Sequence, residues 1–327
     1  MTLGVDSSPY LIGVDLGGTK TVAGVVSLDG ELLSQCTAPT PGKAGAEAIL
    51  DVCAELIHDA IASAGGLPCA IGIGSAGTIN ATTGVVVAST DVLVGWGGTD
   101  IVSGLRERLG MPQIPIAVDN DVNAHARGEL WKGAGSRALS GTGGAPTSAV
   151  VLAIGTGIGG AVILDGMVVS GAHHAAGDFG HIPVAAAGSA VCSCGGIGHV
   201  EAVASGPNIL RHYNTRARDR SQTPAGDTRE VVSRAQGGEP LAWDQLDIAA
   251  QAIGQALAAA SCVVNPDVII LAGGLAHAWD RFFKAIDGHY RASATHSHAL
   301  IPIVEAQLGT SAAVIGAADV ARSQSLA

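Results

Sequence analysis

Cysteine and histidine side chains gather in one stretch, residues 171–201, of a chain that is otherwise rich in Ala, Gly and Val. The run C-x-C-x4-H places Cys192, Cys194 and His199 in glycine-rich sequence that can wrap tightly around an ion. Thiolates and imidazoles are common ligands of tetrahedral Zn²⁺. A fourth ligand must come from elsewhere, and His181 is the nearest upstream imidazole apart from an adjacent histidine pair. We therefore expect a structural zinc site.

Two carboxylates, Asp178 and Glu201, flank this cluster. Both can accept hydrogen bonds from hydroxyl groups, so a metal that shapes a polyol-binding loop would account for the whole stretch. The alternative is that the two thiols are core residues and the histidines are scattered over the surface. The spacing of these residues alone leaves both interpretations open.

A glycine turn near the start of the chain carries groups that suit phosphate. Residues 10–20 (YLIGVDLGGTK) predict a strand that ends at Asp15 and a turn that leads into a second strand. The turn residues are Gly17, Gly18, Thr19 and Lys20. Their backbone N–H groups, hydroxyl and ammonium can cradle phosphate, and Asp15 is placed to hold Mg²⁺ through water. The loop is not a Walker A motif, because GxxxxGK[ST] is absent and a strand follows.

Two other glycine runs, residues 72–77 and 155–160, match G-x-G-x-x-G. Neither is followed by a predicted helix, which excludes the dinucleotide-binding interpretation. The second run lies inside residues 147–164, which carry no charge and have the minimum length of a membrane span. Because glycines interrupt the segment and β-rich runs flank it, we predict a strand, a turn and a strand.

The sequence DND at residues 119–121 follows a predicted strand, residues 114–118, and begins a predicted helix that starts at Asp121. The helix dipole favours the ionised form of an Asp at this place. Helix capping is the simplest explanation of the position, and a catalytic carboxylate is the alternative. Later in the chain, a buried strand at residues 267–272 ends in Gly273 and Gly274, where a nucleotide can approach the backbone closely.

The composition sets limits on the fold and the partners. A chain of 327 residues is long enough for two domains, and its 47 glycines, 47% hydrophobic and 3% aromatic residues suit a tightly packed α/β architecture. The net charge of −11 gives no basic surface for a nucleic acid. We expect neither a membrane span nor a secretory signal, and hence a cytoplasmic protein. No internal sequence repeat is evident.

Five motifs together resemble the ROK family of bacterial sugar kinases and related repressors. They are DLGGTK at 15–20, DND at 119–121, GTGIGG at 155–160, AGDFGHI at 176–182 and CSCGGIGHVEAVASG at 192–206. The resemblance runs over essentially the whole chain. It implies an α/β, actin-like ATPase (ribonuclease H-like) fold with a cleft between two α/β domains. We expect a small domain at 1–119, completed by a C-terminal helix at about 310–327, and a large domain with the zinc loop at 120–309.

The resemblance also implies roles for individual residues. Asp121 would be the catalytic base that accepts the proton of a sugar 6-hydroxyl. The implied substrate-binding residues are Gly77, Thr90, Asn120, Asp121, Asp178, His181 and Glu201. The residues implied to bind ATP and Mg²⁺ are Asp15, Gly17, Gly18, Thr19, Lys20, Gly155, Thr156, Gly157, Gly159, Gly273 and Gly274. His181 would bind a sugar hydroxyl and also the structural Zn²⁺, and a homodimer is implied.

The sequence departs from the family pattern at two places. Asp178 replaces the usual Glu of ExGH, and His199 replaces the third Cys of the zinc motif, which gives a Cys2His2 ligand set. Ser89-Thr90-Asp91, followed by Trp96, resembles the N-acetylmannosamine kinases more than the glucokinases. We therefore expect an N-acetylhexosamine as substrate, with glucose as the alternative. The absence of room before Asp15 for a DNA-binding extension favours a kinase over a repressor.

Two further alternatives stay open. A sugar-sensing regulator without catalytic activity could use the same fold, although intact phosphate turns and carboxylates favour an enzyme. The sequence does not distinguish ATP from polyphosphate as the phosphoryl donor.

Overall fold

The computed structural model describes residues 9–90, 92–138, 147–275 and 280–325. The chain forms two compact units: unit 1 contains Met1–Arg137, Ser170–Ala176 and Gln307–Ala327, and unit 2 contains Ala138–Val169 and Gly177–Ala306. The sequence placed the boundary at residue 119. Unit 1 instead continues to Arg137, because the helix that follows residue 120 packs against the C-terminal helix of the same unit.

Unit 1 is built on a five-stranded sheet with the order β3-β2-β1-β4-β7. Strands β1, β2 and β3 are antiparallel, and β1, β4 and β7 are parallel. Its elements are β1 (Tyr10–Leu16), β2 (Lys20–Ser27), β3 (Leu32–Pro39), α1 (Ala46–Ala64), β4 (Ile71–Ser75), β5 (Thr78–Asn80), β6 (Val85–Ala88), α2 (Ile101–Leu109), β7 (Ile116–Asn120), α3 (Asp121–Trp131), α4 (Ala134–Ala138), η4 (Gly309–Ser311) and α10 (Ala312–Ser325). The strand, turn and strand predicted around Asp15 are confirmed.

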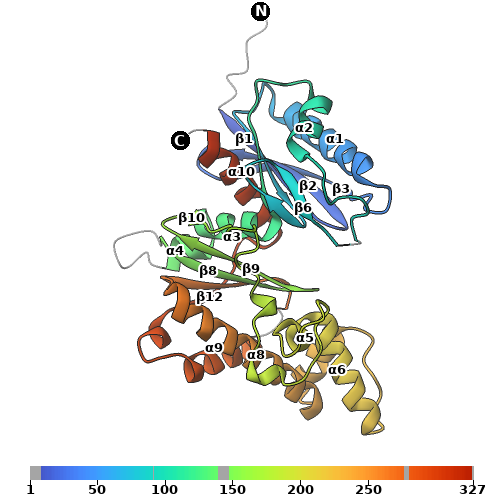
Figure 1. Ribbon diagram of the computed structural model, residues 1–327, viewed down its shortest axis with the longest axis vertical. Helices are drawn as coiled ribbons and strands as arrows, with labels where there is room; N and C mark the ends of the chain where they lie inside the picture. Colours follow the sequence, from blue (N-terminus) through green and yellow to red (C-terminus); the bar gives the residue numbers. More distant parts are fainter. Residues whose placement is uncertain (1–8, 91, 139–146, 276–279, 326–327) are drawn as a thin grey trace, which may run out of the picture. The chain divides into compact units, whose positions relative to one another are not determined.

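Side chains of β1 alternate between the two faces of this sheet, as a strand requires. Ile12 and Val14 belong to the apolar cluster formed with α1 and α2. Leu11 belongs to a separate cluster formed with α10, on the opposite face. Figure 1 shows α1 and α2 on one side of the sheet and α10 on the other.

Glycines allow α10 to lie directly on the backbone of the sheet. A β-carbon on Gly13 would lie 1.9 Å from the carbonyl oxygen of Val314, and one on Gly72 would lie 1.7 Å from that of Ala317. A β-carbon on Gly316 would lie 1.6 Å from the carbonyl oxygen of Ala124, on α3. A real Cβ cannot approach so closely, so these glycines set the distances between β1, β4, α3 and α10.

Unit 2 contains a second five-stranded sheet, with the order β10-β9-β8-β11-β12. Again the first three strands are antiparallel, and β8, β11 and β12 are parallel. Its elements are β8 (Ala149–Ile154), β9 (Ile158–Leu164), β10 (Met167–Val168), η1 (Phe179–His181), η2 (Ala185–Ala187), α5 (Glu201–Ala204), α6 (Gly206–Asp219), α7 (Thr228–Gln236), α8 (Pro240–Val264), β11 (Val268–Ala272), α9 (Asp280–Ser293), η3 (His298–Leu300) and β12 (Ile303–Glu305). The two sheets therefore have the same strand order and directions, although no sequence repeat reveals it.

The uncharged segment at 147–164 is the strand, turn and strand that the sequence predicted, β8 and β9. By length and composition, one helix in the described part of the chain could cross a membrane, namely α8. More than half of its apolar window is buried in the unit. It packs against α9, α7, α6 and α5 and forms the centre of the core of unit 2.

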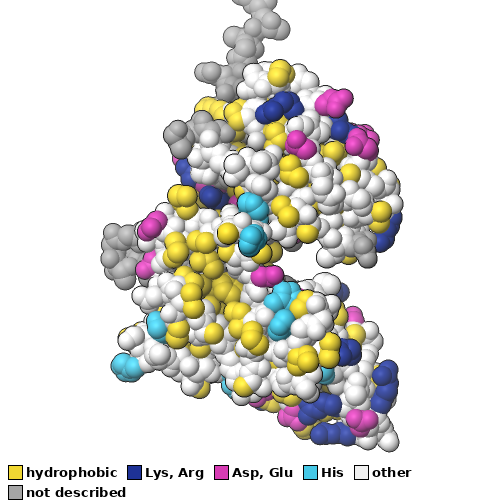
Figure 2. Space-filling model, in the orientation of Figure 1, with side chains coloured by type: hydrophobic (Ala, Val, Ile, Leu, Met, Phe, Trp, Pro, Cys, Tyr) yellow, Lys and Arg dark blue, Asp and Glu magenta, His cyan; other side chains and the backbone are white. Residues whose placement is uncertain are grey.

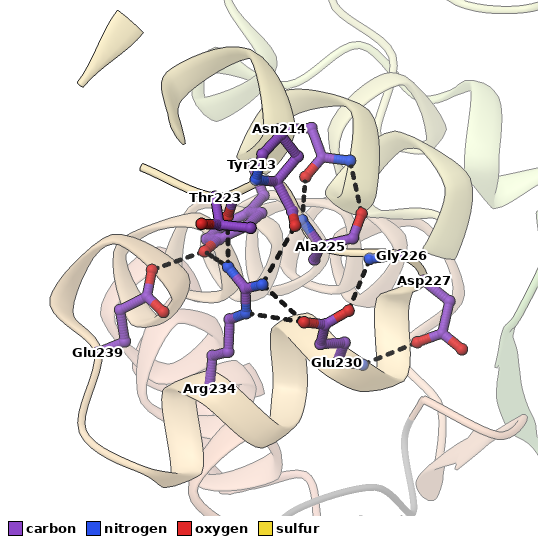
Figure 3. Close-up of polar contacts among 10 residues, drawn as sticks. Tyr213, Asn214, Thr223, Ala225, Gly226, Asp227, Glu230, Arg234 and Glu239 are labelled. Atoms are coloured by element: carbon purple, nitrogen blue, oxygen red, sulfur yellow. Dashed lines mark hydrogen bonds and ion pairs between the residues drawn. The ribbon is translucent and has the colours of Figure 1, made fainter. Parts of the chain in front are cut away.

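A polar network fixes α7 against α6 and the start of α8 (Figure 3). Arg234 donates to the hydroxyl of the buried Tyr213, at 2.7 Å, and to the carboxylate of Glu230, at 2.6 Å. Tyr213 in turn donates to Glu239, at 2.6 Å. The side chain of Thr228, at the start of α7, donates to the carbonyl oxygen of Gly206, at 2.7 Å. The network thus holds the N-terminus of α6, which borders the site described next.

Candidate functional site

Asp15 and Asp121 meet at the carboxyl edge of the sheet in unit 1. Asp15 lies near the end of β1, and Asp121 directly follows β7; β4 runs between these strands. Gly74 of β4 lets α3 pack closely on the strand, because a β-carbon there would lie 2.8 Å from that of Ala124. Burial raises the pKa of Asp15 to about 6, and Lys20 opposes this shift. Burial also raises the pKa of Asp121 to about 6, and the charge of Asp15 adds to the increase.

Asn120, rather than Asp121, caps α3. Its side-chain oxygen accepts hydrogen bonds from the amides of Val122 and Asn123, at 2.9 and 3.2 Å. Asp121 is the first residue of the helix, and its Oδ1 also accepts from the amide of Val122, at 2.9 Å. Burial raises the pKa of this carboxyl, and the hydrogen bond from the Val122 amide opposes the shift. The carboxylate is nevertheless mainly ionised at neutral pH.

The predicted substrate-binding residues of unit 1 lie around Asn120. Its side-chain nitrogen donates to the carbonyl oxygen of Gly77, at 2.8 Å. Gly77 has a φ of 107°, and a β-carbon there would lie 3.5 Å from that of Ser89. Thr90, the next residue, is exposed. The structure thus places Gly77 in contact with Asn120 and beside Ser89, the residue before Thr90; Asp91 lies outside the described residues.

The first glycine turn joins β1 to β2. The amide of Gly17 donates to the carbonyl oxygen of Lys20, at 3.1 Å. Thr40, which follows β3, donates from its hydroxyl to the carbonyl oxygen of Gly17, at 2.8 Å, and from its amide to that of Thr19, at 3.0 Å. Thr19 and Lys20 are exposed, while Gly18 is half-buried. A buried threonine of the neighbouring strand therefore fixes the shape of this turn.

The second glycine turn joins β8 to β9 in unit 2. The amide of Gly155 donates to the carbonyl oxygen of Gly157, at 3.0 Å, and the amide of Gly206 donates to that of Gly155, at 2.9 Å. The amide of Ile158 donates to the carboxylate of Glu201, at 2.9 Å. The predicted phosphate ligand Thr156 is exposed, and Gly159 is half-buried on β9.

Gly273 and Gly274 lie beside the second turn. Gly273 has a φ of 91°, and a β-carbon there would lie 2.3 Å from the carbonyl oxygen of Ile154. The amide of Leu275 donates to the same oxygen, at 3.3 Å. Within the described part of the chain, nothing would lie within 4 Å of a β-carbon on Gly274, so these residues leave its backbone open to an incoming group. The structure therefore brings the predicted adenosine-binding and phosphate-binding glycines of unit 2 together.

The four predicted zinc ligands form one cluster in unit 2. One ligand atom from each of His181, Cys192, Cys194 and His199 lies within 4.8 Å of the others. His181 Nδ1 is 3.5 Å from Cys192 Sγ, and His199 Nδ1 is 3.2 Å from Cys194 Sγ. Such a set of two sulfurs and two nitrogens fits tetrahedral Zn²⁺. Figure 2 shows histidine side chains at the surface over the segment between β9 and α5.

Glycines shape the loop around this cluster. The amide of Cys192 donates to the carbonyl oxygen of Gly196, at 2.8 Å, which closes a tight turn. A β-carbon on Gly196 would lie 2.3 Å from the imidazole of His199, so only glycine leaves room for that ligand. The alternative interpretation, in which the thiols are core residues and the histidines are scattered over the surface, does not describe this geometry.

The predicted sugar ligands of unit 2 border the cluster. Asp178 is exposed, and its Oδ1 lies 3.8 Å from His181 Nε2. His181 therefore directs Nδ1 towards the thiol and leaves Nε2 on the side of Asp178. Both carboxylate oxygens of Glu201 have protein donors: Ile158 N at Oε2, and the hydroxyl of Ser193 at Oε1, each at 2.9 Å.

Sequence reasoning missed three residues that position this machinery. Thr40 shapes the first turn, and Ser193 binds Glu201. Asp119 is buried, accepts from the amide of Asn120 and the side chain of Asn123, and so steadies the start of α3. Only Ser193 carries a signal in the sequence, since it stands between the two cysteines of the metal motif.

Comparison with known proteins identifies the family. The model of the ROK family matches residues 11–324. A glucokinase of Halalkalibacterium halodurans is 30% identical over 97% of this chain and 96% of its own length. An N-acetylmannosamine kinase of Escherichia coli is 26% identical over 96% of this chain and 99% of its own.

The solved structures give the same result. A ROK family glucokinase from Streptomyces griseus, in complex with glucose and AMPPNP, superimposes with a TM-score of 0.74 at 30% identity, covering 96% of this chain and 99% of that one. Membership of the same family accounts for the two sheets of equal strand order described above. The chain belongs to the ROK family and has the actin-like ATPase fold of its sugar kinases.

Proposed function

We propose that this protein is an ATP-dependent kinase that transfers the γ-phosphoryl group to the 6-hydroxyl of a hexose. The observation that carries the proposal is the pair of half-buried carboxylates, Asp15 and Asp121, at one edge of the sheet in unit 1. Phosphoryl transfer needs one carboxylate near the attacking hydroxyl and another near the metal that accompanies the nucleotide. The names of the glucokinase and N-acetylmannosamine kinase relatives support the same reaction.

Asp121 would act as the base. A pKa of about 6 leaves the carboxylate mostly ionised at neutral pH and more basic than an ordinary Asp, which suits removal of a hydroxyl proton. Asn120, fixed by its contact with Gly77, would orient the sugar beside it. Asn120 caps α3 through two amides, at 2.9 and 3.2 Å, so the helix does not depend on Asp121 for its cap.

The two glycine turns would bind the phosphates through their amides, and Lys20 would add a positive charge at the first turn. The predicted Mg²⁺ would be held by Asp15; when bound, it neutralises phosphate charge. Gly273 and the open backbone of Gly274 would receive the adenosine. The AMPPNP in the Streptomyces griseus glucokinase supports ATP as a donor.

The Cys2His2 cluster would hold a structural Zn²⁺. With His181 Nδ1 on the metal, Nε2 would remain available for a sugar hydroxyl, together with Asp178 and Glu201. The metal would thus orient a substrate ligand without taking part in the transfer.

For the sugar, we propose an N-acetylhexosamine, on the resemblance of Ser89-Thr90-Asp91 to N-acetylmannosamine kinases. Glucose is the competing substrate, because the named relatives include both activities. We also propose a homodimer, on the family resemblance alone; light scattering of the purified protein tests it.

A coupled ADP-release assay with Mg·ATP tests the function. Glucose, N-acetylglucosamine, N-acetylmannosamine, mannose and allose should be compared at equal concentrations. Turnover with an N-acetyl sugar well above that with glucose supports both the kinase and its specificity. A preference for glucose keeps the kinase and rejects the N-acetylhexosamine. No turnover with any sugar, with ATP or polyphosphate, rejects the kinase in favour of a sugar-sensing regulator.

A further inference from the structure

Glu201 connects two parts of unit 2 that are far apart in the sequence. Its Oε2 accepts a hydrogen bond from the amide of Ile158, in the second glycine turn, at 2.9 Å. Its Oε1 accepts one from the hydroxyl of Ser193, in the metal loop, also at 2.9 Å. A β-carbon on Gly157 would lie only 3.0 Å from Oε2, so the carboxylate lies directly against the turn.

Ser193 is held on both sides by predicted metal ligands. Cys192 precedes it and Cys194 follows it, and their sulfurs belong to the four-ligand cluster. A metal on both thiolates fixes the chain on either side of Ser193 and therefore the direction of its hydroxyl. Without the metal, the turn keeps its backbone hydrogen bonds from Cys192 N to Gly196 O, at 2.8 Å, and from Gly195 N to Cys192 O, at 2.9 Å, but the exposed side chains of Ser193 and Cys194 lose the ion that fixes their direction.

The second turn needs support of this kind. It contains Gly155 and Gly157, and two more glycines follow Ile158, so the unrestrained segment has high conformational entropy. Within the turn, one hydrogen bond joins the amide of Gly155 to the carbonyl oxygen of Gly157. The hydrogen bond to Glu201 fixes the direction of the Ile158 amide. It thereby also restricts the neighbouring amides of the turn, which would face phosphate.

We propose that Ser193 and Glu201 form a link through which the metal holds the second glycine turn in its nucleotide-binding shape. Ser193 is then a positioning residue for the nucleotide, although the metal lies on the sugar side of the site. The inference rests on the proposed function, since it assigns the turn to ATP. It predicts that metal loss weakens nucleotide binding, and that removal of the Ser193 hydroxyl has the same effect with the metal still bound.

The test is a calorimetric titration of AMPPNP with Mg²⁺ into four proteins: wild type and Ser193→Ala, each loaded with Zn²⁺ and after chelation. Loss of a hydrogen bond to a carboxylate should raise the Kd for AMPPNP about tenfold in the loaded variant. Chelation should raise the Kd of the wild type similarly and that of Ser193→Ala much less, because the link is already broken. Zinc content confirms that the variant retains its metal.

Two controls separate the link from general damage. Ser148→Ala removes a hydroxyl that also donates to a carboxylate at 2.9 Å in unit 2, on Asp267, and it should bind AMPPNP like wild type. Ser193→Thr keeps the hydroxyl and should restore binding. Hydrogen exchange of the Ile158 amide provides a direct readout, and it should become faster in Ser193→Ala and after chelation.

The outcomes distinguish the two proposals. Equal AMPPNP affinity and equal Ile158 exchange in all four proteins would overturn the link and leave the kinase proposal intact. Weakened binding in Ser193→Ala with unchanged Ile158 exchange would also overturn it, because the turn would not be involved. No binding of AMPPNP by the zinc-loaded wild type would overturn both proposals.

Discussion

The two glycine turns occupy the same place in two sheets of the same strand order, but different parts of the chain hold them. Thr40 holds the first turn, and it directly follows β3 of the same sheet. Glu201 holds the second, and it lies 43 residues beyond Ile158, outside the sheet. The first turn can therefore form together with its sheet, whereas the second depends on the metal loop.

The distribution of charge differs in the same way. The sheet of unit 1 carries two half-buried carboxylates beside its turn, Asp15 and Asp121. In unit 2, the second turn has no carboxylate of its own, and that of Glu201 is brought to it by α5. One sheet thus supplies the groups that suit proton removal, and the other depends on neighbouring loops for its polar contacts.

The largest expected effect comes from Asp121→Asn, which tests whether the chemistry belongs to unit 1. Loss of a general base should lower kcat by about 10²–10⁴-fold, while the sugar still binds. ADP release gives kcat, and titration with sugar gives the affinity. Asp29→Asn, at an exposed turn of the same sheet, is the control and should have wild-type activity. Activity of Asp121→Asn within a few-fold of wild type would remove this residue as the base.

The next largest effect should follow the double change Cys192→Ser with Cys194→Ser. Zinc should be lost, and sugar affinity should fall about 10–100-fold, because His181 and its neighbours lose their orientation. Hydrogen exchange should become faster at Ile158 and stay unchanged at Gly17, whose turn does not depend on the metal. Equal acceleration at both amides would contradict the difference between the turns. Wild-type protein without any zinc would reject the metal site itself.

Thr40→Val is the converse test, because it disturbs the first turn and leaves the second turn unchanged. The substitution keeps the shape of the side chain and removes the hydroxyl that donates to Gly17. The net value of one hydrogen bond, about 1–1.5 kcal/mol, corresponds to a rise of about tenfold in KM for ATP. Ser63→Ala is the control, since its hydroxyl also donates to a backbone carbonyl oxygen of unit 1, that of Ala60 on α1, at 2.8 Å. Unchanged KM in Thr40→Val, or faster exchange at Ile158, would mean that the turns are not supported independently.

The smallest effect is the pH dependence of the rate. The base must be ionised, and burial raises the pKa of Asp121 to about 6, so kcat should rise with pH and reach half of its plateau near pH 6. The plateau should extend over neutral and mildly alkaline pH. Measurement of kcat from pH 5 to 8 with saturating substrates gives the midpoint. A midpoint near the ordinary Asp value of 3.8 would show that burial does not govern this carboxyl.

The same shift has a consequence for stability. In the folded state both carboxyls bind protons more tightly than in the unfolded chain, where the pKa is 3.8. The free energy of unfolding therefore decreases as the pH rises from about 4 to about 6, because both carboxyls lose their protons inside the folded protein. Replacing either Asp with Asn should raise the melting temperature above pH 6, where the buried charge is otherwise present.

Local spacing predicted the metal cluster well, because three of its ligands lie within eight residues and glycines mark the turn. The contact between Ile158 and Glu201 could not be predicted in this way, since it joins segments that only the fold brings together. The sequence also could not decide which residue of DND caps the helix. All three can cap, and Asn120 does so because its side chain reaches two amides and Gly77 at once.

The fold class followed from the motifs, but the repeated sheet did not. Strand pairing requires alternating buried side chains and suitable turns, which unrelated sequences can provide. The short strands β5 and β12 fell in segments without a clear periodic pattern. The boundary at residue 119 missed the extension of unit 1 because the packing of α3 on α10 depends on glycines on both helices, Gly128 and Gly316, which lie 188 residues apart in the sequence.

That packing also constrains how the protein is made. Strand β1 begins at Tyr10, and the helix that covers one of its faces begins about 300 residues later, at Ala312. At about 5–20 residues per second, a ribosome needs about 15–60 s to reach that helix. Throughout this time the face with Leu11, Val22 and Val26 lacks its cover. Folding of the first unit to be synthesised is therefore completed last, and until then one apolar face of its sheet stays uncovered.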